Sequence, residues 1–416
     1  MTEGNRGQAV VIGAGIVGLC GAAYLQRDGW SVTVIDPGPP GESCSFGNAG
    51  MMSDHTALPV GMPGILWRVP GMLLDPMGPL AVRWSYLPRL APWLVRFLAS
   101  STTARVERFV ADFGTLIERA KVAYAPLIAD AGAEALIRRR GSLEVFETEA
   151  AFNRARWGLE LRQRHGVPIR ALGGEEIRQI EPALRAGFAG AFYREDMDHI
   201  VNPLRLSQGI ADAILRKGGI FVRGEARAIA KRADGKTEIA TDTAPLAADI
   251  VVISAGAWSK KFARDAGARV PLDTERGYHA MLPHPGVEMR VPVKSHEGGF
   301  FLTPMEKGLR VVGTDELAGL NAPPNYKRLE PMIARAKTMV PGLNTDDSEP
   351  WMGFRPSFPD SKPVIGRAPG SPNVLCAFGH GHFGLTLAAV TAEAIADLAA
   401  GRATKLDLAP FAPTRF

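Results

Sequence analysis

Near its amino terminus the chain runs from an apolar segment, residues 9–12, into three glycines with G-x-G-x-x-G spacing: Gly13, Gly15 and Gly18. An amphipathic segment follows, and a second apolar segment, residues 32–35, ends on Asp36. This order predicts a strand, a tight turn, a helix and a second strand. The glycines let a pyrophosphate approach the helix N-terminus, and the acid accepts hydrogen bonds from ribose hydroxyls. We therefore predict a dinucleotide site; a glycine turn without a ligand is the alternative.

Composition limits the remaining choices. The 416 residues are 46% hydrophobic and 22% charged, which is ordinary for a globular enzyme of two domains or one large domain. The net charge of +5 is small for this length, and the sequence has no long basic run. We therefore expect no nucleic-acid partner.

The three cysteines, Cys20, Cys44 and Cys376, lie far apart and show no zinc-binding spacing, so we predict no metal and free thiols in a reducing compartment. Residues 1–8 are short and polar, which predicts no signal peptide. No apolar run reaches about 18 residues, so we expect no membrane-spanning helix. Together these features predict a cytoplasmic protein.

Two further segments resemble nucleotide-binding elements. Residues 248–253 predict a buried strand that leads through small residues into a helix, and residues 373–378 predict a last parallel strand. A second glycine-rich turn, Gly379 to Gly384, follows that strand and opens a final helix. Sheet-like and proline-rich segments lie between these elements. We therefore predict an α/β and α+β fold with a discontinuous nucleotide domain (1–55, 196–262 and 346–416) and an inserted domain on a mixed, largely antiparallel sheet (56–195 and 263–345).

The second glycine turn favours FAD over NAD. It places backbone N–H groups at a helix N-terminus, and a reduced flavin gains negative charge at its N1–C2=O edge, which such a terminus stabilises. An oxidised nicotinamide ring has no such requirement. Only the first G-x-G-x-x-G is followed by a second apolar segment that ends on an acid, so a separate NAD(P) domain is not expected.

Residues 62–100 are unusually rich in Pro, Met, Trp and Leu, with arginines at intervals. A buried helical cap is the favoured interpretation. The alternative is an amphipathic patch, from Trp67 to Phe97, that contacts a membrane surface or a partner chain.

Four motifs together resemble a known family: Gly13–Gly18, the loop Ser43–Gly50 with its Asn-Ala-Gly ending, Trp351–Pro356 with its G-x-R-P segment, and Gly379–Thr386. In this order they resemble FAD-dependent amino-acid dehydrogenases of the D-amino-acid oxidase, glycine oxidase and sarcosine oxidase superfamily, above all the small subunit of bacterial D-amino-acid dehydrogenases. The resemblance spans nearly the whole chain and does not specify one substrate.

The resemblance implies a glutathione-reductase-like Rossmann domain for FAD and a second domain for the substrate. Sarcosine oxidases attach flavin to a cysteine near the last glycine turn, whereas Cys376 precedes that turn within the predicted strand, so we expect non-covalent FAD. The residues predicted to contact FAD are Gly13, Gly15, Ile16, Val17, Gly18, Asp36, Ser43, Ser45, Asn48, Ala49, Gly50, Ala226, Ala255, Gly256, Trp258, Gly379, Gly381, His382, Gly384, Leu385 and Thr386.

Oxidation of an α-amino acid needs a carboxylate clamp that holds Cα over flavin N5. Arginine suits this task because its fork bonds both oxygens, and Arg355 matches the clamp position of the family. A structural ion pair is the alternative role for Arg355.

Four further side chains are candidates for the catalytic site. Tyr278 is predicted to donate to the carboxylate and His279 to face the amine; a packed aromatic ring and a buried structural histidine are equally good interpretations. His55 follows the Asn-Ala-Gly loop and is expected near the flavin. His382 lies in the flavin turn and either lines the substrate pocket or faces solvent.

These features predict an FAD-dependent D-amino-acid dehydrogenase that forms an imine and then a 2-oxo acid, with cyclic substrates such as D-proline or hydroxy-D-proline included. The resemblance implies that the electrons pass to a quinone or another carrier of an electron-transfer chain. The alternatives are a glycine- or sarcosine-type oxidase that produces peroxide, and a flavin-holding subunit of a larger complex. A peripheral contact with the inner face of the cytoplasmic membrane and homo- or hetero-oligomers are compatible with the sequence.

Overall fold

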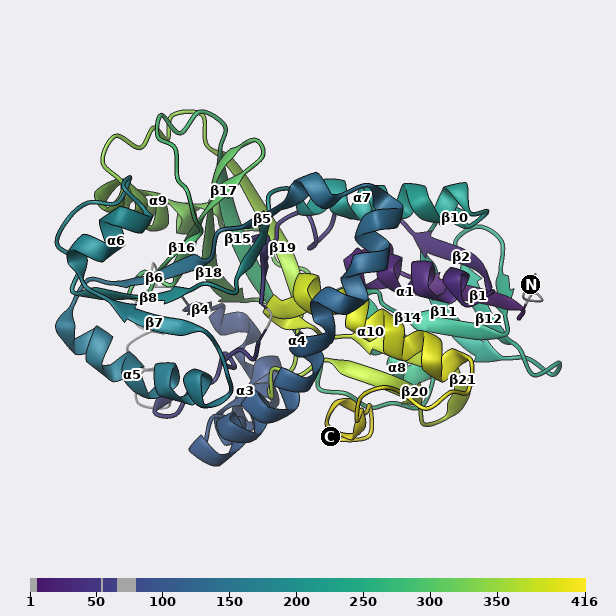
Figure 1. The fold of residues 1–416 in the computed structure, drawn as a ribbon. Helices are drawn as coiled ribbons and strands as arrows, with labels where there is room; N and C mark the ends of the chain where they lie inside the picture. The colour runs from purple at the N-terminus through teal and green to yellow at the C-terminus, as the bar shows by residue number, and fades with distance from the viewer. Residues whose placement is uncertain (1–5, 54, 66–79) are drawn as a thin grey trace.

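A computed structural model describes residues 6–53, 55–65 and 80–416. Figure 1 shows two lobes side by side, each built on its own β-sheet, with the N-terminus at the outer end of one lobe. The predicted segment at residues 62–100 lies partly outside the described residues.

The first lobe contains a six-stranded sheet in the order β10-β2-β1-β14-β21-β20. Its first five strands are parallel, and β20 is antiparallel to β21. Most of these strands are buried on both faces, as expected for parallel strands covered by other elements. The strands are β1 (Gln8–Ile12), β2 (Ser31–Asp36), β10 (Ile220–Arg223), β14 (Ile250–Ile253), β20 (Val364–Ala368) and β21 (Ser371–Phe378).

Helices from the beginning, middle and end of the chain share the main hydrophobic core with this sheet. The two that come from opposite ends of the chain, α1 and α10, pack directly against each other, and α4 crosses α10 (Figure 1). The helices are α1 (Ile16–Arg27), α4 (Thr103–Ala131), α7 (Pro203–Arg216) and α10 (Gly384–Ala399).

The other face of the sheet carries a small antiparallel sheet and α8. The small sheet contains β11 (Ala226–Lys231), β12 (Thr237–Thr241) and β13 (Leu246–Ala248), and α8 spans Ser259–Asp265.

One segment of the described chain, Gly381–Ala399, is long and apolar enough to cross a membrane by length and composition alone. It contains α10, and 67% of this apolar stretch is buried inside the fold. A helix that is apolar all round is expected in the core of a large protein, and the packing against α1 and α4 accounts for its composition.

The second lobe contains a nine-stranded mixed sheet, ordered β19-β15-β18-β17-β16-β6-β8-β7 with β4 also paired to β18. The central strands β15 and β18 are each ten residues long and antiparallel. The strands are β4 (Leu80–Val82), β6 (Ser142–Phe146), β7 (Ile169–Leu172), β8 (Gly190–Arg194), β15 (Asp273–Leu282), β16 (Val293–Ser295), β17 (Phe300–Met305), β18 (Gly308–Leu317) and β19 (Glu349–Ser357).

Helices cover this second sheet, and a short sheet lies beside it. The core on one face includes residues of α9 and α6. The helices are α3 (Leu87–Ser100), α5 (Glu149–Arg164), α6 (Gly174–Ile180) and α9 (Leu329–Met339), and the short sheet has the order β3 (Met51–Met52), β9 (Asp198–Ile200) and β5 (Ile137–Arg139).

For two of these elements, the predicted domain differs from the lobe in which the element packs. They place residues 349–357 in the nucleotide domain, but β19 pairs with β15 in the nine-stranded sheet. They place residues 103–131 in the substrate domain, but α4 packs against α10 in the core of the first lobe. Both assignments depend on pairing between distant segments, which the local sequence pattern does not reveal.

Candidate active site

The first glycine turn adopts the close packing that its sequence predicts. Gly13 has a φ of +112°, and its amide donates to the Ile35 carbonyl at 2.9 Å. A Cβ on Gly18 would lie 1.9 Å from the Gly13 carbonyl oxygen, so only glycine lets α1 start this close to β1. The segment with Gly15, Ile16 and Val17 therefore presents the N-terminus of α1 at the edge where β1 ends.

Two side chains complete this turn. The Asp36 carboxylate accepts from the Ala14 amide at 2.7 Å and from the Gly38 amide at 2.8 Å. Each oxygen keeps a lone pair for a ribose hydroxyl. The Ser45 hydroxyl accepts from the Ile16 amide at 2.9 Å, so the loop that begins near Ser43 reaches the N-terminus of α1.

Arg310 holds the rest of that loop from the second lobe. It lies on β18, and its Nη1 donates to the carbonyls of Phe46 at 2.8 Å and Asn48 at 2.6 Å. Asn48 also accepts from the Gly50 amide at 2.8 Å, which shapes the turn through Ala49. Burial lowers the pKa of Arg310 to about 10, so the side chain stays charged at neutral pH. The sequence analysis missed this arginine because its contacts join residues far apart in the chain.

His199 on β9 lies beneath the same loop and was also missed. A Cβ on Gly50 would lie 2.9 Å from its ring. Burial lowers the pKa of His199 to about 4, and its Nε2 has no hydrogen-bond partner within the described parts of the chain. Its ring is therefore neutral at physiological pH.

The last glycine turn lies at the same edge of the six-stranded sheet as the first. Gly379, with a φ of +80°, follows β21, and the short 3₁₀ turn Gly381–Phe383 leads into α10 at Gly384. The Thr386 hydroxyl donates to the Met51 carbonyl at 3.4 Å, just after the Asn-Ala-Gly loop. The Leu385 carbonyl accepts from Tyr124 on α4 at 2.7 Å. The predicted convergence of the two glycine turns is thus present.

The middle of the chain contributes the remaining predicted contacts. Ala255 and Gly256 follow β14 at this same edge, and Gly256 has a φ of +53° with open space where a side chain would be. Trp258 is half-exposed and packs edge-on against Phe354. Ala226 begins β11 and is buried.

These residues fit FAD. The Gly18 contact leaves no room for a side chain beside the phosphate turn, and Asp36 stands where the second strand ends. Cys376 is fully buried within β21, and burial raises the pKa of its thiol to about 12, which disfavours the thiolate needed for a flavin linkage. This environment supports non-covalent binding.

Arg355 lies on β19, the edge strand of the nine-stranded sheet. Arg355 lies opposite Glu275 of the adjacent strand β15, and its guanidinium passes over Gly277 of that same strand. A Cβ on Gly277 would lie 2.1 Å from Arg355 Cζ, so glycine at 277 is required for this path. The guanidinium then bonds Asp315 on β18, on the far side of β15.

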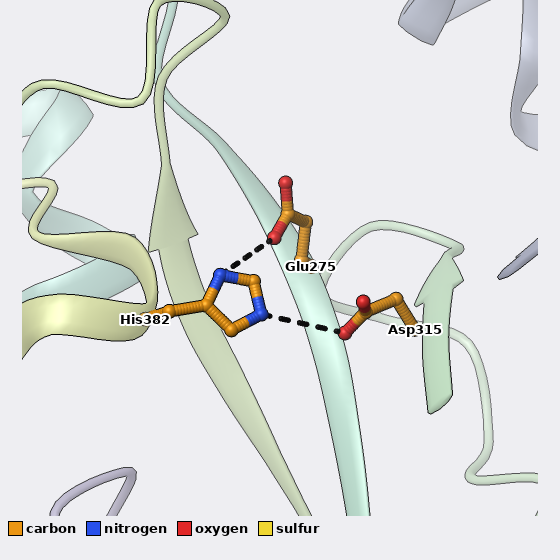
Figure 2. A group of neighbouring side chains, drawn as sticks. All are labelled: Glu275, Asp315 and His382. Atoms are coloured by element: carbon orange, nitrogen blue, oxygen red, sulfur yellow. Dashed lines mark ion pairs between the residues drawn. The ribbon is translucent and has the colours of Figure 1, made fainter. Parts of the chain in front are cut away.

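Figure 2 shows how the flavin turn joins this group. The His382 ring points between two carboxylates, with Nδ1 3.8 Å from Glu275 and Nε2 3.8 Å from Asp315. Glu275 also accepts from the Ser357 hydroxyl at 2.8 Å. The predicted residues Arg355 and His382 are therefore brought together, along with two acids that the sequence analysis did not single out.

The two acids have opposite pKa shifts. Burial raises the pKa of Glu275. Burial also acts to raise the pKa of Asp315, but Arg355 and His382 together outweigh it and lower that pKa. Asp315 is thus ionised, whereas Glu275 lies in an environment that penalises its negative charge.

His279 lies on the same face of β15, two residues beyond Gly277. Its ring stacks on Trp351 with centroids 4.9 Å apart and lies 5.8 Å from the Phe46 ring in the flavin loop. Burial and the nearby Arg310 charge lower the pKa of His279 to about 3. It is a neutral ring between the sheet and the loop, and its Nδ1 has no partner among the described residues.

Tyr278 lies on the opposite face of β15, in the core near α9. Its hydroxyl donates to Glu316 at 2.5 Å and accepts from the Asn325 amide. Successive side chains of a strand point to opposite faces, so Tyr278 and Arg355 are not brought together. The interpretation as a packed aromatic ring describes its place in the structure.

His55 belongs to a separate group. Its Nδ1 lies 3.0 Å from Asp196, which also pairs with Arg194 at 2.8 Å. The structure shows no contact between His55 and the Arg355 group within the described residues.

Glu275, Asp315 and His382 also form a group whose donor atoms could hold a metal ion, all within 4.8 Å of one another. An arginine already bonds one of these acids, which disfavours a dedicated cation site. The absence of a metal from the reaction stays a prediction.

Comparisons with known proteins identify the family. A family model described as FAD dependent oxidoreductase matches residues 8–398. The chain is 38% identical to a D-amino-acid oxidase of Bradyrhizobium diazoefficiens over 100% of both chains. It is 31% identical to a D-amino acid dehydrogenase of Paramagnetospirillum magneticum, over 98% of this chain and 99% of the relative.

The fold agrees with that assignment. It matches the crystal structure of glycine oxidase from Geobacillus kaustophilus with a TM-score of 0.76 and 20% identity, over 99% of both chains. The paired glycine turns, the arginine on β19 and these matches lead to one conclusion. The chain belongs to the DAO family of FAD-dependent oxidoreductases.

Proposed function

We propose that this FAD-dependent oxidoreductase oxidises D-amino acids to imines, which water hydrolyses to 2-oxo acids and ammonia. The names of the two relatives, a D-amino-acid oxidase and a D-amino acid dehydrogenase, support this substrate class. One structural observation carries the proposal: His382 of the flavin turn reaches the acid group that pairs with Arg355. A carboxylate on Arg355 would therefore lie beside the flavin turn.

The residues of this chain supply binding and orientation. When bound, FAD supplies the acceptor for the hydride that leaves Cα. Arg355 would hold the substrate carboxylate through its planar fork, and the path over Gly277 fixes the direction of that fork. The carboxylates of Glu275 and Asp315 offer a positive amino group a place beside Arg355.

Anaerobic flavin reduction tests the activity. The purified holoenzyme should be yellow, and a panel of D-amino acids, including D-proline and hydroxy-D-proline, should bleach the flavin absorbance. The L-enantiomers serve as matched controls. Bleaching by L-amino acids alone, or by none of the panel, would contradict the proposal.

An Arg355→Ala variant tests the clamp. Loss of a desolvated, charge-assisted contact costs about 2–5 kcal/mol, so substrate affinity should fall at least roughly thirtyfold while FAD stays bound. Arg140→Ala, which removes an exposed arginine elsewhere on the second lobe, is the control and should leave affinity unchanged. Equal affinity in both variants would assign the carboxylate to another residue.

The electron acceptor is proposed to be a quinone or another carrier of an electron-transfer chain. The relatives' names include both an oxidase and a dehydrogenase. If the acceptor is such a carrier, dye reduction should be fast and peroxide formation slow with the same D-amino acid. Stoichiometric peroxide would assign the chain to the oxidases, and activity confined to glycine or sarcosine would support the glycine-oxidase alternative.

A peripheral membrane contact is proposed for α3. Its inner side chains, Leu90, Trp93 and Phe97, are buried, but Val95 on the outer side is 68% exposed and the preceding Trp84 is 64% exposed. Residues 80–106 contain arginines and no acidic residue. An exposed surface that combines tryptophan, aliphatic and basic residues suits an anionic bilayer surface.

Vesicle sedimentation tests this contact. The holoenzyme should sediment with anionic phospholipid vesicles and less with neutral ones, and Trp84→Ser with Val95→Ser should reduce sedimentation without loss of dye-linked activity. Val122→Ser, on an exposed part of α4, is the control. Equal sedimentation with and without vesicles would contradict the proposed membrane contact. Size-exclusion mass would then establish whether it is a monomer or a homo-oligomer.

A further inference from the structure

The proposed carboxylate clamp already has an acidic partner. The Arg355 guanidinium bonds the Asp315 carboxylate, and both side chains are partly accessible, with 15% and 29% of their surfaces exposed. Any substrate carboxylate that binds Arg355 through its fork must therefore compete with Asp315. A simple carboxylic acid would release Asp315 without offering it a new partner, which is unfavourable for a partly buried charge.

Glu275 provides a second, independent observation. Its Oε1 accepts from Ser357 at 2.8 Å, but its Oε2 is buried without a hydrogen-bond partner in the described chain. The residue is 5% exposed, and His382 Nδ1 lies 3.8 Å from Oε2, beyond hydrogen-bond distance. A buried carboxylate oxygen without a donor is costly, and it marks a place where an incoming donor would bind.

The backbone positions Asp315 for this arrangement. A β-bulge between Gly277 and Tyr278 makes Thr314 the extra residue of β18, with a φ of +52°. The bulge brings residue 315 opposite Gly277, beneath the guanidinium of Arg355. Bulges often redirect a side chain beside a functional site, and a positive φ at threonine is a strained conformation.

We propose that Asp315 occupies Arg355 in the free enzyme and that only a zwitterionic amino acid displaces it efficiently. The substrate carboxylate takes Arg355, and its ammonium group binds the released Asp315 and the free oxygen of Glu275. The Arg355–Asp315 ion pair is thus exchanged for two ion pairs with the substrate rather than lost. This inference rests on the proposed role of Arg355 as the carboxylate clamp.

The exchange favours ligands that carry both a carboxylate and an ammonium group. Amino acids are favoured over carboxylic acids that lack the amine, including 2-hydroxy acids and the 2-oxo acid product. Because the 2-oxo acid carries no ammonium group, Asp315 returns to Arg355 and favours release of this product. Asp315 is thus a specificity-determining residue for the proposed reaction.

An Asp315→Asn variant of the holoenzyme tests the exchange with two matched ligands. The probes are the best D-amino acid of the panel and the carboxylic acid with the same carbon skeleton, such as D-alanine with propanoate. The variant should bind propanoate at least tenfold more tightly and need at least tenfold more D-alanine for half-maximal flavin bleaching. Glu349→Gln, an exposed acid on β19, removes the same charge and should change neither value more than twofold.

The outcomes separate this inference from the proposed function. If Arg355→Ala abolishes binding of both ligands but Asp315→Asn moves both affinities in the same direction, the clamp stands and the exchange is wrong. If Arg355→Ala leaves both affinities intact, the clamp itself is wrong. Should Asp315→Asn fail to fold, Asp315→Ser is measured with the same two ligands and must show the same opposite shifts.

Discussion

At the scale of single residues, Gly277 determines whether the clamp can form. Its missing Cβ is the space through which the Arg355 guanidinium passes toward Asp315. A Gly277→Ala variant should therefore displace the guanidinium and raise the substrate concentration for half-maximal bleaching at least tenfold, a change of about 1.4 kcal/mol. Flavin content should be unchanged. Gly173→Ala is the control, because φ there is an ordinary −85° and an added Cβ would lie 3.9 Å from Glu176 Oε2, a normal contact distance.

Tyr278 and His279 show how far single residues can be predicted. The sequence predicted both as active-site candidates, and strict alternation along a strand could have separated them, because neighbouring side chains take opposite faces. Arg355 and His279 share one face, whereas Tyr278 lies in the core of the other. Asp315 could not be found in this way, because the bulge at Thr314 changes the register of β18.

At the scale of elements, β18 controls the flavin loop through Arg310. An Arg310→Met variant keeps much of the apolar stem but leaves the carbonyls of Phe46 and Asn48 without their donor. We expect FAD affinity to fall at least tenfold, measured as the flavin retained after gel filtration at several protein concentrations. Arg269→Met, an exposed position after α8, is the control. Full flavin retention in the Arg310 variant would contradict this role.

A second element-scale prediction concerns the pairing of β6 with β16. Residue Lys294 lies opposite Glu144 and bonds it at 2.8 Å, and His296 lies 2.9 Å from the same carboxylate. Burial acts to raise the pKa of Glu144, but Lys294, His296 and Arg162 together outweigh it and hold that pKa well below its ordinary value of 4.5. The charge therefore stabilises the fold above pH 4.5, and the stabilisation is lost as the pH falls below that value.

A Glu144→Gln variant should be less stable at pH 7 by about 3 kcal/mol, since it leaves partly buried cations without their partner. The difference from the unmodified protein should shrink as the pH falls below 4.5. Denaturant unfolding at a series of pH values measures it. A difference that grows in acid would mean that Glu144 is not ionised in the folded protein.

The elements of the first lobe follow directly from local sequence. The strand, glycine turn and helix at residues 8–27 and the last strand and turn at 371–384 have patterns that depend on neighbours in the chain. In contrast, β19 was not expected in the second sheet, because its membership depends on hydrogen bonds to β15, whose paired residues lie 68 to 84 positions earlier in the chain. Long-range pairing is thus the part of the site that local patterns could not give.

At the scale of the whole molecule, the cofactor site draws on the beginning, middle and end of the chain. FAD should therefore stabilise the entire fold. A ligand present at a thousand times its Kd adds about 4 kcal/mol to the stability of the folded state. The apoprotein should melt at a lower temperature than the holoenzyme, and added FAD should raise the midpoint in a concentration-dependent way. A midpoint that does not respond to FAD would contradict a site shared by these segments.

The Trp351 side chain lies between the flavin loop and β19. Its indole fits between two glycines, since a Cβ on Gly47 or on Gly353 would lie 1.8 Å or 2.1 Å from its ring, and it stacks on His279. Gly47 belongs to the flavin loop and Gly353 to the strand of the clamp. This indole is therefore a built-in optical reporter: the fluorescence that Trp351→Phe removes should change when either the loop or the strand shifts.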